Sequence, residues 1–223
     1  MNTVPDRRRV WMVRIGLLAT ILVVGTFLYA LWNRDHLIRD AKRQVEALRA
    51  GDGKTVASFA LPEELEHTPA PAIERLIAEI VTPRLRLARF NENGVYELVN
   101  SPPTQSVGGV RGRLENGQNV SLLVAVFDTE KGGKSLVVQN SLFHAWQMLD
   151  RSENPNVPKE ITRTYLNGLR ADRVRLEAMG VSGMYCGPDR GFVTWDECER
   201  TWSQRLASRE RSRAQLNNRP QGR

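Results

Sequence analysis

An uncharged apolar run near the start of the chain constrains its architecture more than any other feature. Ile15–Trp32 reads IGLLATILVVGTFLYALW and contains no Asp, Glu, Lys or Arg. A helix of this run is about 27 Å long, close to the ~30 Å hydrocarbon core of a bilayer. The run predicts a transmembrane helix over 15–32, in preference to a buried core helix.

The residues at both edges of the run suit a membrane surface. Trp11 and Arg14 lie at one edge, and Tyr29 and Trp32 lie at the other. Tryptophan and tyrosine favour the headgroup region, and arginine can extend its charge into it. A cleaved signal peptide is the alternative, but no A-x-A cleavage pattern follows the run. We therefore expect an uncleaved anchor.

Charge and cysteine content favour one orientation of this anchor. Residues 1–14 carry a net charge of +3 in a short tail beside the span, which favours the cytoplasmic side. The two cysteines form an even pair, which suits an oxidising compartment. We expect a single-pass protein of the inner (cell) membrane, with a cytoplasmic N-terminus and a periplasmic or extracellular domain.

The rest of the net charge of +7 does not indicate a nucleic-acid partner. Residues 33–150 carry −1, and residues 151–223 carry +5. A nucleic-acid-binding domain usually gathers Lys and Arg on its folded face. We therefore expect no nucleic acid, although a domain facing the cytoplasm would make it a candidate again.

Hydrophobic periodicity predicts helices in the first part of the domain. Leu37, Ala41, Val45 and Leu48 recur at helical spacing, so a helix should continue out of the membrane as far as Gly51. A short helix is expected over 54–60. Another is expected over 73–81, and Pro83 should close it.

From Arg84 the apolar period changes to two, which predicts a meander of antiparallel strands. Turns are expected at Asn93-Gly94, at Asn116-Gly117 and over 131–134. The first expected strand starts at Arg84. Four more are expected over Val95–Val99, Val107–Glu115, Val120–Phe127 and Ser135–Met148. Since Val120–Phe127 is apolar on both faces, this sheet should be covered on both sides or curled around an interior.

The fragment Val45–Asp52, VEALRAGD, closes the first helix of this series. Three helices with this fragment, followed by a curved meander, resemble the nuclear transport factor 2-like (cystatin-like) α+β roll over about residues 36–149. The resemblance implies a cone-shaped cavity, which that family uses for small ligands, for isomerase or hydratase chemistry, or for partner contacts. The layout is similar to that of type IV secretion inner-membrane assembly subunits.

The predicted organisation has four parts. They are a basic cytoplasmic tail (1–14), a transmembrane helix (15–32), the α+β domain with helices on a curved antiparallel sheet (33–150), and a C-terminal helical region with a basic tail (151–223). In the last part, a helix should run to about Met179, and Thr194 with Glu197 should form a capping box for a final helix.

Cys186 and Cys198 are candidates for a disulfide. Eleven residues separate them, so a disulfide would restrict the unfolded chain by about 3 kcal/mol. Two reduced, buried thiols are the alternative. No metal and no cofactor is expected, because further zinc ligands are missing and a calcium-like loop over 186–197 lacks carboxylates at its first ligand positions.

Asn140, His144 and Trp146 share one face of the predicted strand Ser135–Met148, where they would line the cone. A histidine and an amide there could handle a proton, but no carboxylate lies at motif distance, so a core histidine is the favoured interpretation. We predict no catalytic residue and do not expect an enzyme.

The end of the chain is rich in arginine. Residues 200–223 contain seven Arg and a single acidic residue, Glu210. Arg205, Arg209, Arg211 and Arg213 are candidate contacts for an acidic protein patch or anionic lipid headgroups, with a solvated helix end as the alternative.

These features favour a non-catalytic membrane-anchored scaffold or accessory subunit of a cell-envelope complex. Its expected partners are the membrane and other envelope proteins or further copies of itself. The alternative is a small-ligand binder or pocket enzyme that uses the cone.

Overall fold

The computed structural model describes residues 7–91, 96–97, 105–129, 132–154, 160–186 and 190–217. Side chains are described for these residues except 7–16, 27–35, 96–97, 105–106 and 213–217. The fold is α+β, with helices packed against an antiparallel sheet and further helices at the C-terminal end, as the sequence predicts at that level.

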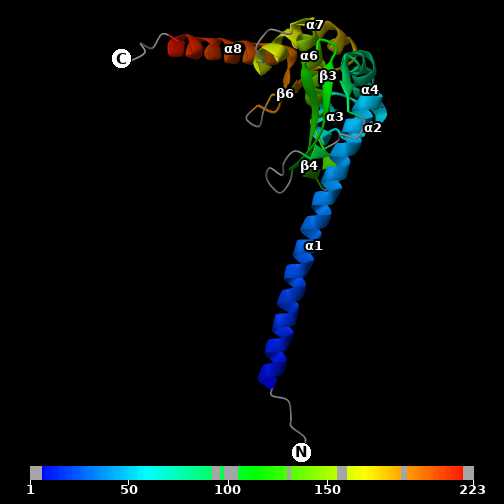
Figure 1. Cartoon of the computed structure of the whole chain (residues 1–223), viewed down its shortest axis with the longest axis vertical. Coiled ribbons are helices and arrows are strands. Elements are labelled where there is room, and N and C mark those ends of the chain that lie inside the picture. The colour runs from blue at the N-terminus through cyan, green and yellow to red at the C-terminus, as the bar shows by residue number, and fades with distance from the viewer. Residues whose placement is uncertain are drawn as a thin grey trace, which may run out of the picture.

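The longest element is helix α1 (Arg7–Ala50), which projects far out of the domain (Figure 1). Its predicted face of Leu37, Ala41, Val45 and Leu48 is buried in the core. By contrast, every described side chain from residue 17 to residue 26 is exposed. No helix whose side chains are described is both long and apolar enough to cross a membrane. The predicted span 15–32 extends beyond those side chains.

Short helices follow α1. They are α2 (Gly53–Ser58), α3 (Pro62–His67), α4 (Ala70–Leu76), the π-helical turn η1 (Ile77–Val81) and α5 (Thr82–Leu85). Gly51 has a φ of +74°, a conformation that favours glycine, and ends α1. The Asp52 side chain then caps α2 by accepting from the Thr55 N–H.

The prediction that Pro83 closes a helix is wrong, because helical structure continues to Leu85. Proline lacks the N–H that would donate to a carbonyl one turn earlier, and a π-helical turn precedes it. The Glu79 carbonyl accepts instead from the Arg175 guanidinium at 3.2 Å. The prediction of a strand from Arg84 is also wrong. Arg84 and Leu85 belong to helix α5, and the first strand begins at Ala88.

The sheet contains β1 (Ala88–Phe90), β2 (Tyr96–Glu97), β3 (Gln105–Leu114), β4 (Asn119–Thr129) and β5 (Gly132–Lys134). Its order is β1-β3-β4-β5, with β2 also pairing with β3, and all pairs are antiparallel. The turn at Asn116-Gly117 is confirmed, with Gly117 at a φ of +85°. The turn at Asn93-Gly94 lies outside the described residues.

One face of the sheet packs against α1. Val110, Leu122 and Val124 are fully buried on it, and a Cβ at Gly108 would lie 2.9 Å from that of Ala41 on α1. The other face, with Leu123 and Phe127, is half-buried. The sheet is therefore covered fully on one side and partly on the other.

The predicted strand Ser135–Met148 is wrong, because this segment forms helix α6 (Val137–Glu153). Glu64 of α3 accepts the backbone N–H groups of Val137 and Val138, both at 2.8 Å, and so caps the helix from a distant part of the chain. α6 then runs along the open edge of β4. Its His144 ring contacts the Leu123 backbone there, and Arg151 donates to the Asn119 carbonyl at 2.5 Å.

The C-terminal part contains α7 (Ile161–Ala178), the hairpin β6 (Gly183–Tyr185) with β7 (Phe192–Thr194), and α8 (Trp195–Asn217). The predicted capping box is confirmed by bonds between Thr194 and Glu197. The buried rings of Tyr165 and Trp202 stack 4.1 Å apart, and one hydrophobic core includes residues from α1 to α8.

Candidate functional site

The largest cavity described is an open groove of about 610 Å³ between α3, the end of β4 and the β6–β7 hairpin. We call it the acidic groove. Its lining residues are Leu61, Glu63, Glu66, His67, Phe127, Leu136, Tyr185, Gly191 and Phe192.

One wall of the acidic groove is held in place by a buried carboxylate. Pro62 starts the six-residue helix α3, and Glu64 turns inward to cap α6. The two neighbouring acidic residues, Glu63 and Glu66, are therefore left exposed along the groove. Neither forms an ion pair with a described Lys or Arg side chain.

The opposite wall is aromatic. The backbone pairing of Tyr185 with Phe192 fixes the hairpin, and their rings meet edge to face at 5.7 Å. His67 of α3 stacks on Phe192 with ring centroids 4.9 Å apart, which joins the two walls. Carboxylates beside aromatic faces suit a cation with an apolar stem, above all arginine.

Burial gives Glu64 an unusual titration. Burial raises the pKa of this carboxyl to about 7. The hydrogen bonds from two backbone N–H groups lower the pKa, but burial has the larger effect. The side chain has only 1% of its surface exposed, and it lies behind the groove rather than among its lining residues. We therefore assign Glu64 to positioning α3 and α6, not to contact with a partner.

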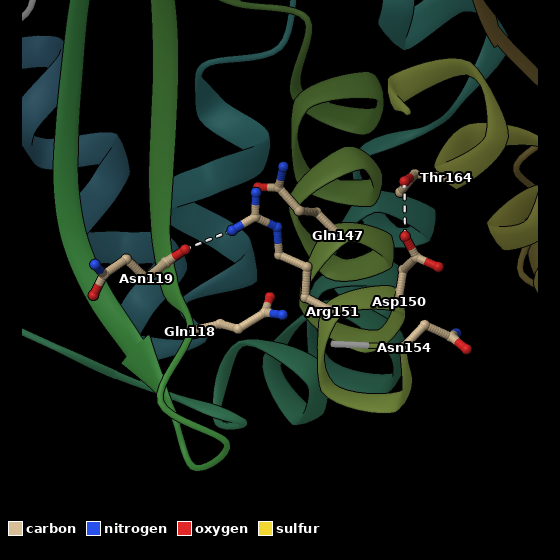
Figure 2. A pocket seen from close by; sticks show the side chains of 7 residues that line it. All are labelled: Gln118, Asn119, Gln147, Asp150, Arg151, Asn154 and Thr164. Atoms are coloured by element: carbon tan, nitrogen blue, oxygen red, sulfur yellow. Dashed lines mark hydrogen bonds between the residues drawn. The ribbon is translucent and has the colours of Figure 1, made fainter. Parts of the chain in front are cut away.

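A second cavity, of about 250 Å³, is lined by polar and charged residues (Figure 2). It lies between the start of β4, the end of α6 and α7, and its lining residues are Gln118, Asn119, Gln147, Asp150, Arg151, Asn154 and Thr164. Figure 2 shows Arg151 extending from α6 to the Asn119 backbone, with the Gln147 amide beside it. Asp150 turns away from them to accept from the Thr164 hydroxyl at 3.1 Å.

The described lining of this polar pocket includes one hydroxyl–carboxylate pair, Thr164 with Asp150, but no histidine, lysine or cysteine. Gln147 is 6% exposed, and its amide has no hydrogen-bond partner among the described residues. Asp150 and Arg151 form no ion pair with each other. Such a lining suits a small polar molecule or ordered water.

The residues predicted to line a cone are elsewhere. Because they lie on α6 rather than on a strand, Asn140, His144 and Trp146 do not share a sheet face. His144 is 3% exposed and binds the edge of β4, and the Trp146 indole donates to Asp172 at 2.7 Å. None of the three lines the acidic groove or the polar pocket.

The predicted disulfide partners do lie together. Cys186 and Cys198 are buried thiols whose Sγ atoms are 2.9 Å apart. The hydrogen bond from Cys198 lowers the pKa of Cys186 to about 7, while the same contact and burial raise the pKa of Cys198. The disulfide itself stays a prediction for oxidising conditions. Within the described parts of the chain, no His, Cys, Asp or Glu side chains gather into a possible metal site.

The predicted anion contacts all lie on α8. Arg209 pairs with the buried Glu160 at 2.7 Å, and Arg205 lies over the Trp202 ring at 5.7 Å. Arg211 donates to the Ala207 carbonyl of its own helix. The side chain of Arg213 lies outside those described, as do the side chains at the predicted membrane edges, Trp11, Arg14, Tyr29 and Trp32.

Sequence reasoning did not find the acidic groove. Its lining residues come from three separate parts of the chain, which only tertiary packing brings together: 61–67, 127 with 136, and 185 with 191–192. The one local signal is PEELEH at 62–67, a run with three glutamates whose middle member is buried. Periodicity over so short a helix cannot show which glutamate turns inward.

Comparison with known proteins does not identify a relative. A search against protein families found no match, and no curated protein is significantly similar to this chain.

Proposed function

We propose that this protein is a non-catalytic scaffold or accessory subunit of a cell-envelope complex, anchored in the inner membrane by residues 15–32. Its N-terminus would lie in the cytoplasm, and its domain, related in shape to the nuclear transport factor 2-like roll, would dock other proteins outside it.

The observation that carries the proposal is the division of α1 into two parts. Between residues 17 and 26, six large apolar side chains are each 49% to 68% exposed. They are Leu17, Leu18, Ile21, Leu22, Val23 and Val24. The same helix then continues without a break into the core of the domain. Exposing such an apolar surface to water is energetically unfavourable, whereas the hydrocarbon core of a bilayer solvates it.

The continuous helix also supports a scaffold. Only a few residues separate Trp32, the end of the predicted span, from Leu37, the first of the described side chains of α1 that is buried in the core. A helix this short between bilayer and core would hold the domain close to the membrane at a fixed angle, as an assembly subunit requires. The acidic groove then provides a docking surface of defined chemistry.

A pair of substitutions in the exposed run tests the anchor. Leu18→Asp with Leu22→Asp should release the full chain from the membrane fraction, because each Asp costs about 2.5–3.5 kcal/mol at the centre of a span. The matched pair Leu18→Ala with Leu22→Ala should stay in the membrane. If the aspartate pair stays as firmly bound as the wild type, the run is not the anchor.

A second candidate function, binding of a small polar molecule, rests on the polar pocket. The observation that favours it is the Gln147 amide, which lines this pocket and has no hydrogen-bond partner among the described residues. A thermal-shift screen of sugars, amino acids and small carboxylates tests this candidate. A stabilising compound that loses its effect in Gln147→Leu would support it.

A further inference from the structure

We propose that the acidic groove binds the arginine-bearing end of α8 from a second copy of this chain, so that two copies clasp each other reciprocally. The inference rests on the proposed function, because it names a partner for the docking groove of the membrane-anchored scaffold. We define the arginine-bearing end as residues 203–217 of α8.

The groove has a charge that the described structure leaves unbalanced. Glu63 and Glu66 both lie on its α3 wall without a described basic partner. Across from them, Tyr185 and Phe192 offer aromatic faces. An arginine side chain fits both walls, because its apolar stem packs on rings while its guanidinium pairs with carboxylates.

The end of α8 has the complementary charge and is accessible. Trp202 is buried against the domain, and the described side chains beyond it, up to residue 212, are exposed except for those at 203 and 206, which are half-buried. The stretch from Trp202 to Asn217 is about 22 Å long. Pairs with Glu160 and Arg163 tie Arg209 and Glu210 to α7, but Arg211 has no carboxylate partner among the described residues.

The arrangement of the elements favours a contact between two copies. Figure 1 shows α8 leaving the domain crosswise to α1, on the same side as the β6–β7 hairpin that forms one groove wall. The end of α8 points away from its own domain, so a continuous helix cannot return to its own groove.

A twofold axis parallel to α1 satisfies both copies at once. In the proposed dimer, rotation about this axis turns the groove side of each copy toward the other, so that each α8 end would enter the opposite groove. The two α1 helices keep the same direction, as two anchors in one membrane require. Such an interface is self-complementary and closed, which is the commonest arrangement of homodimers.

Charge reversal on each side of the contact tests the clasp with the full chain in mild detergent. The groove variant carries Glu63→Arg and Glu66→Arg, and the tail variant carries Arg211→Glu and Arg213→Glu. The matched control carries Glu115→Arg and Glu153→Arg, two exposed glutamates outside the groove. Self-association is measured by sedimentation, and mixing by co-purification of differently tagged copies.

The clasp predicts that wild type and control dimerise equally, and that each variant alone dimerises about tenfold or more weakly because like charges then meet. A mixture of the two variants should form heterodimers, since both of its contacts again join opposite charges. Added salt should weaken wild-type dimers. Thermal melting of each variant checks folding, and Glu63→Gln with Glu66→Gln is the milder substitute if the groove variant does not fold.

Three results would overturn the clasp: a monomeric wild type, variants that dimerise as tightly as wild type, or folded variants whose mixture does not associate. The membrane fraction of the same cells separates this failure from that of the proposed function. A membrane-bound monomer would contradict the clasp alone, whereas a chain freely soluble without detergent would contradict the anchor.

Discussion

At the scale of single residues, Glu64 makes stability depend on pH. Its pKa is raised to about 7 in the folded protein from an ordinary value of 4.5, mainly by burial. The folded state therefore holds the proton more tightly than the unfolded chain. The stability from this group is fully present below pH 4.5 and is lost as pH rises through 7, which corresponds to about 3 kcal/mol.

Glu64→Gln should abolish this dependence, because the amide does not titrate. We expect the wild type to lose stability between pH 5 and pH 8 and the variant to change much less, measured by urea unfolding of the detergent-solubilised chain. The difference between the two proteins removes the contribution of the histidines. Equal pH profiles would show that Glu64 is ionised throughout.

Gly168 is required by the packing of a single side chain. A Cβ at this position in α7 would lie 2.1 Å from Cγ of the buried Trp146. Gly168→Ala should therefore destabilise the protein by about 1–3 kcal/mol, although alanine favours a helix by about 1 kcal/mol. Gly25→Ala is the matched control, since nothing lies within 4 Å of a Cβ there. Thermal melting should show a lower midpoint for Gly168→Ala and an unchanged midpoint for Gly25→Ala.

At the scale of elements, one buried ion pair joins three helices. Asp172 of α7 accepts from the Arg84 guanidinium of α5 and from the Trp146 indole of α6. Arg84→Met leaves this carboxylate buried without its cation, so we expect a loss of about 3–5 kcal/mol in denaturant unfolding. Arg75→Met breaks an exposed pair with Glu79 and should cost less than about 1 kcal/mol. Similar costs for both variants would contradict a structural role for Asp172.

Element prediction succeeded where local signals decide the structure. The buried face of α1 follows from its apolar spacing, and the turn at Asn116-Gly117 from glycine's access to positive φ. It failed for α6, whose β-branched start and alternating polar residues imitate a strand. The cap at the start of α6 comes from Glu64, more than seventy residues earlier, so no local sequence pattern could predict it.

The candidate site shows the same limit. The proximity of Cys186 and Cys198 was predictable, because only eleven residues separate them and Cys198 lies near the start of the capped helix α8. The acidic groove was not, because Glu63 and Glu66 meet Phe192 only after α3 has been fixed against α6. Local sequence patterns thus predicted the elements with local order, whereas packing between distant segments created the acidic groove.

At the scale of the whole molecule, the orientation in the membrane should determine the redox state of the two cysteines. If the domain lies outside the cytoplasm, Cys186 and Cys198 should form a disulfide in cells, because their Sγ atoms are already in contact at 2.9 Å. Trapping free thiols with an alkylating reagent during lysis, followed by mass spectrometry, checks this. Two alkylated cysteines in chains taken directly from cells would contradict an oxidising location.

The central claim is that the apolar part of α1 remains in the chain and holds the domain at a membrane. Alkaline carbonate extraction of cell membranes, followed by the intact mass of the extracted protein, tests it most directly. The account predicts the full 25.2 kDa chain in the carbonate-resistant pellet. A chain in the soluble fraction that lacks its first thirty or so residues would contradict it.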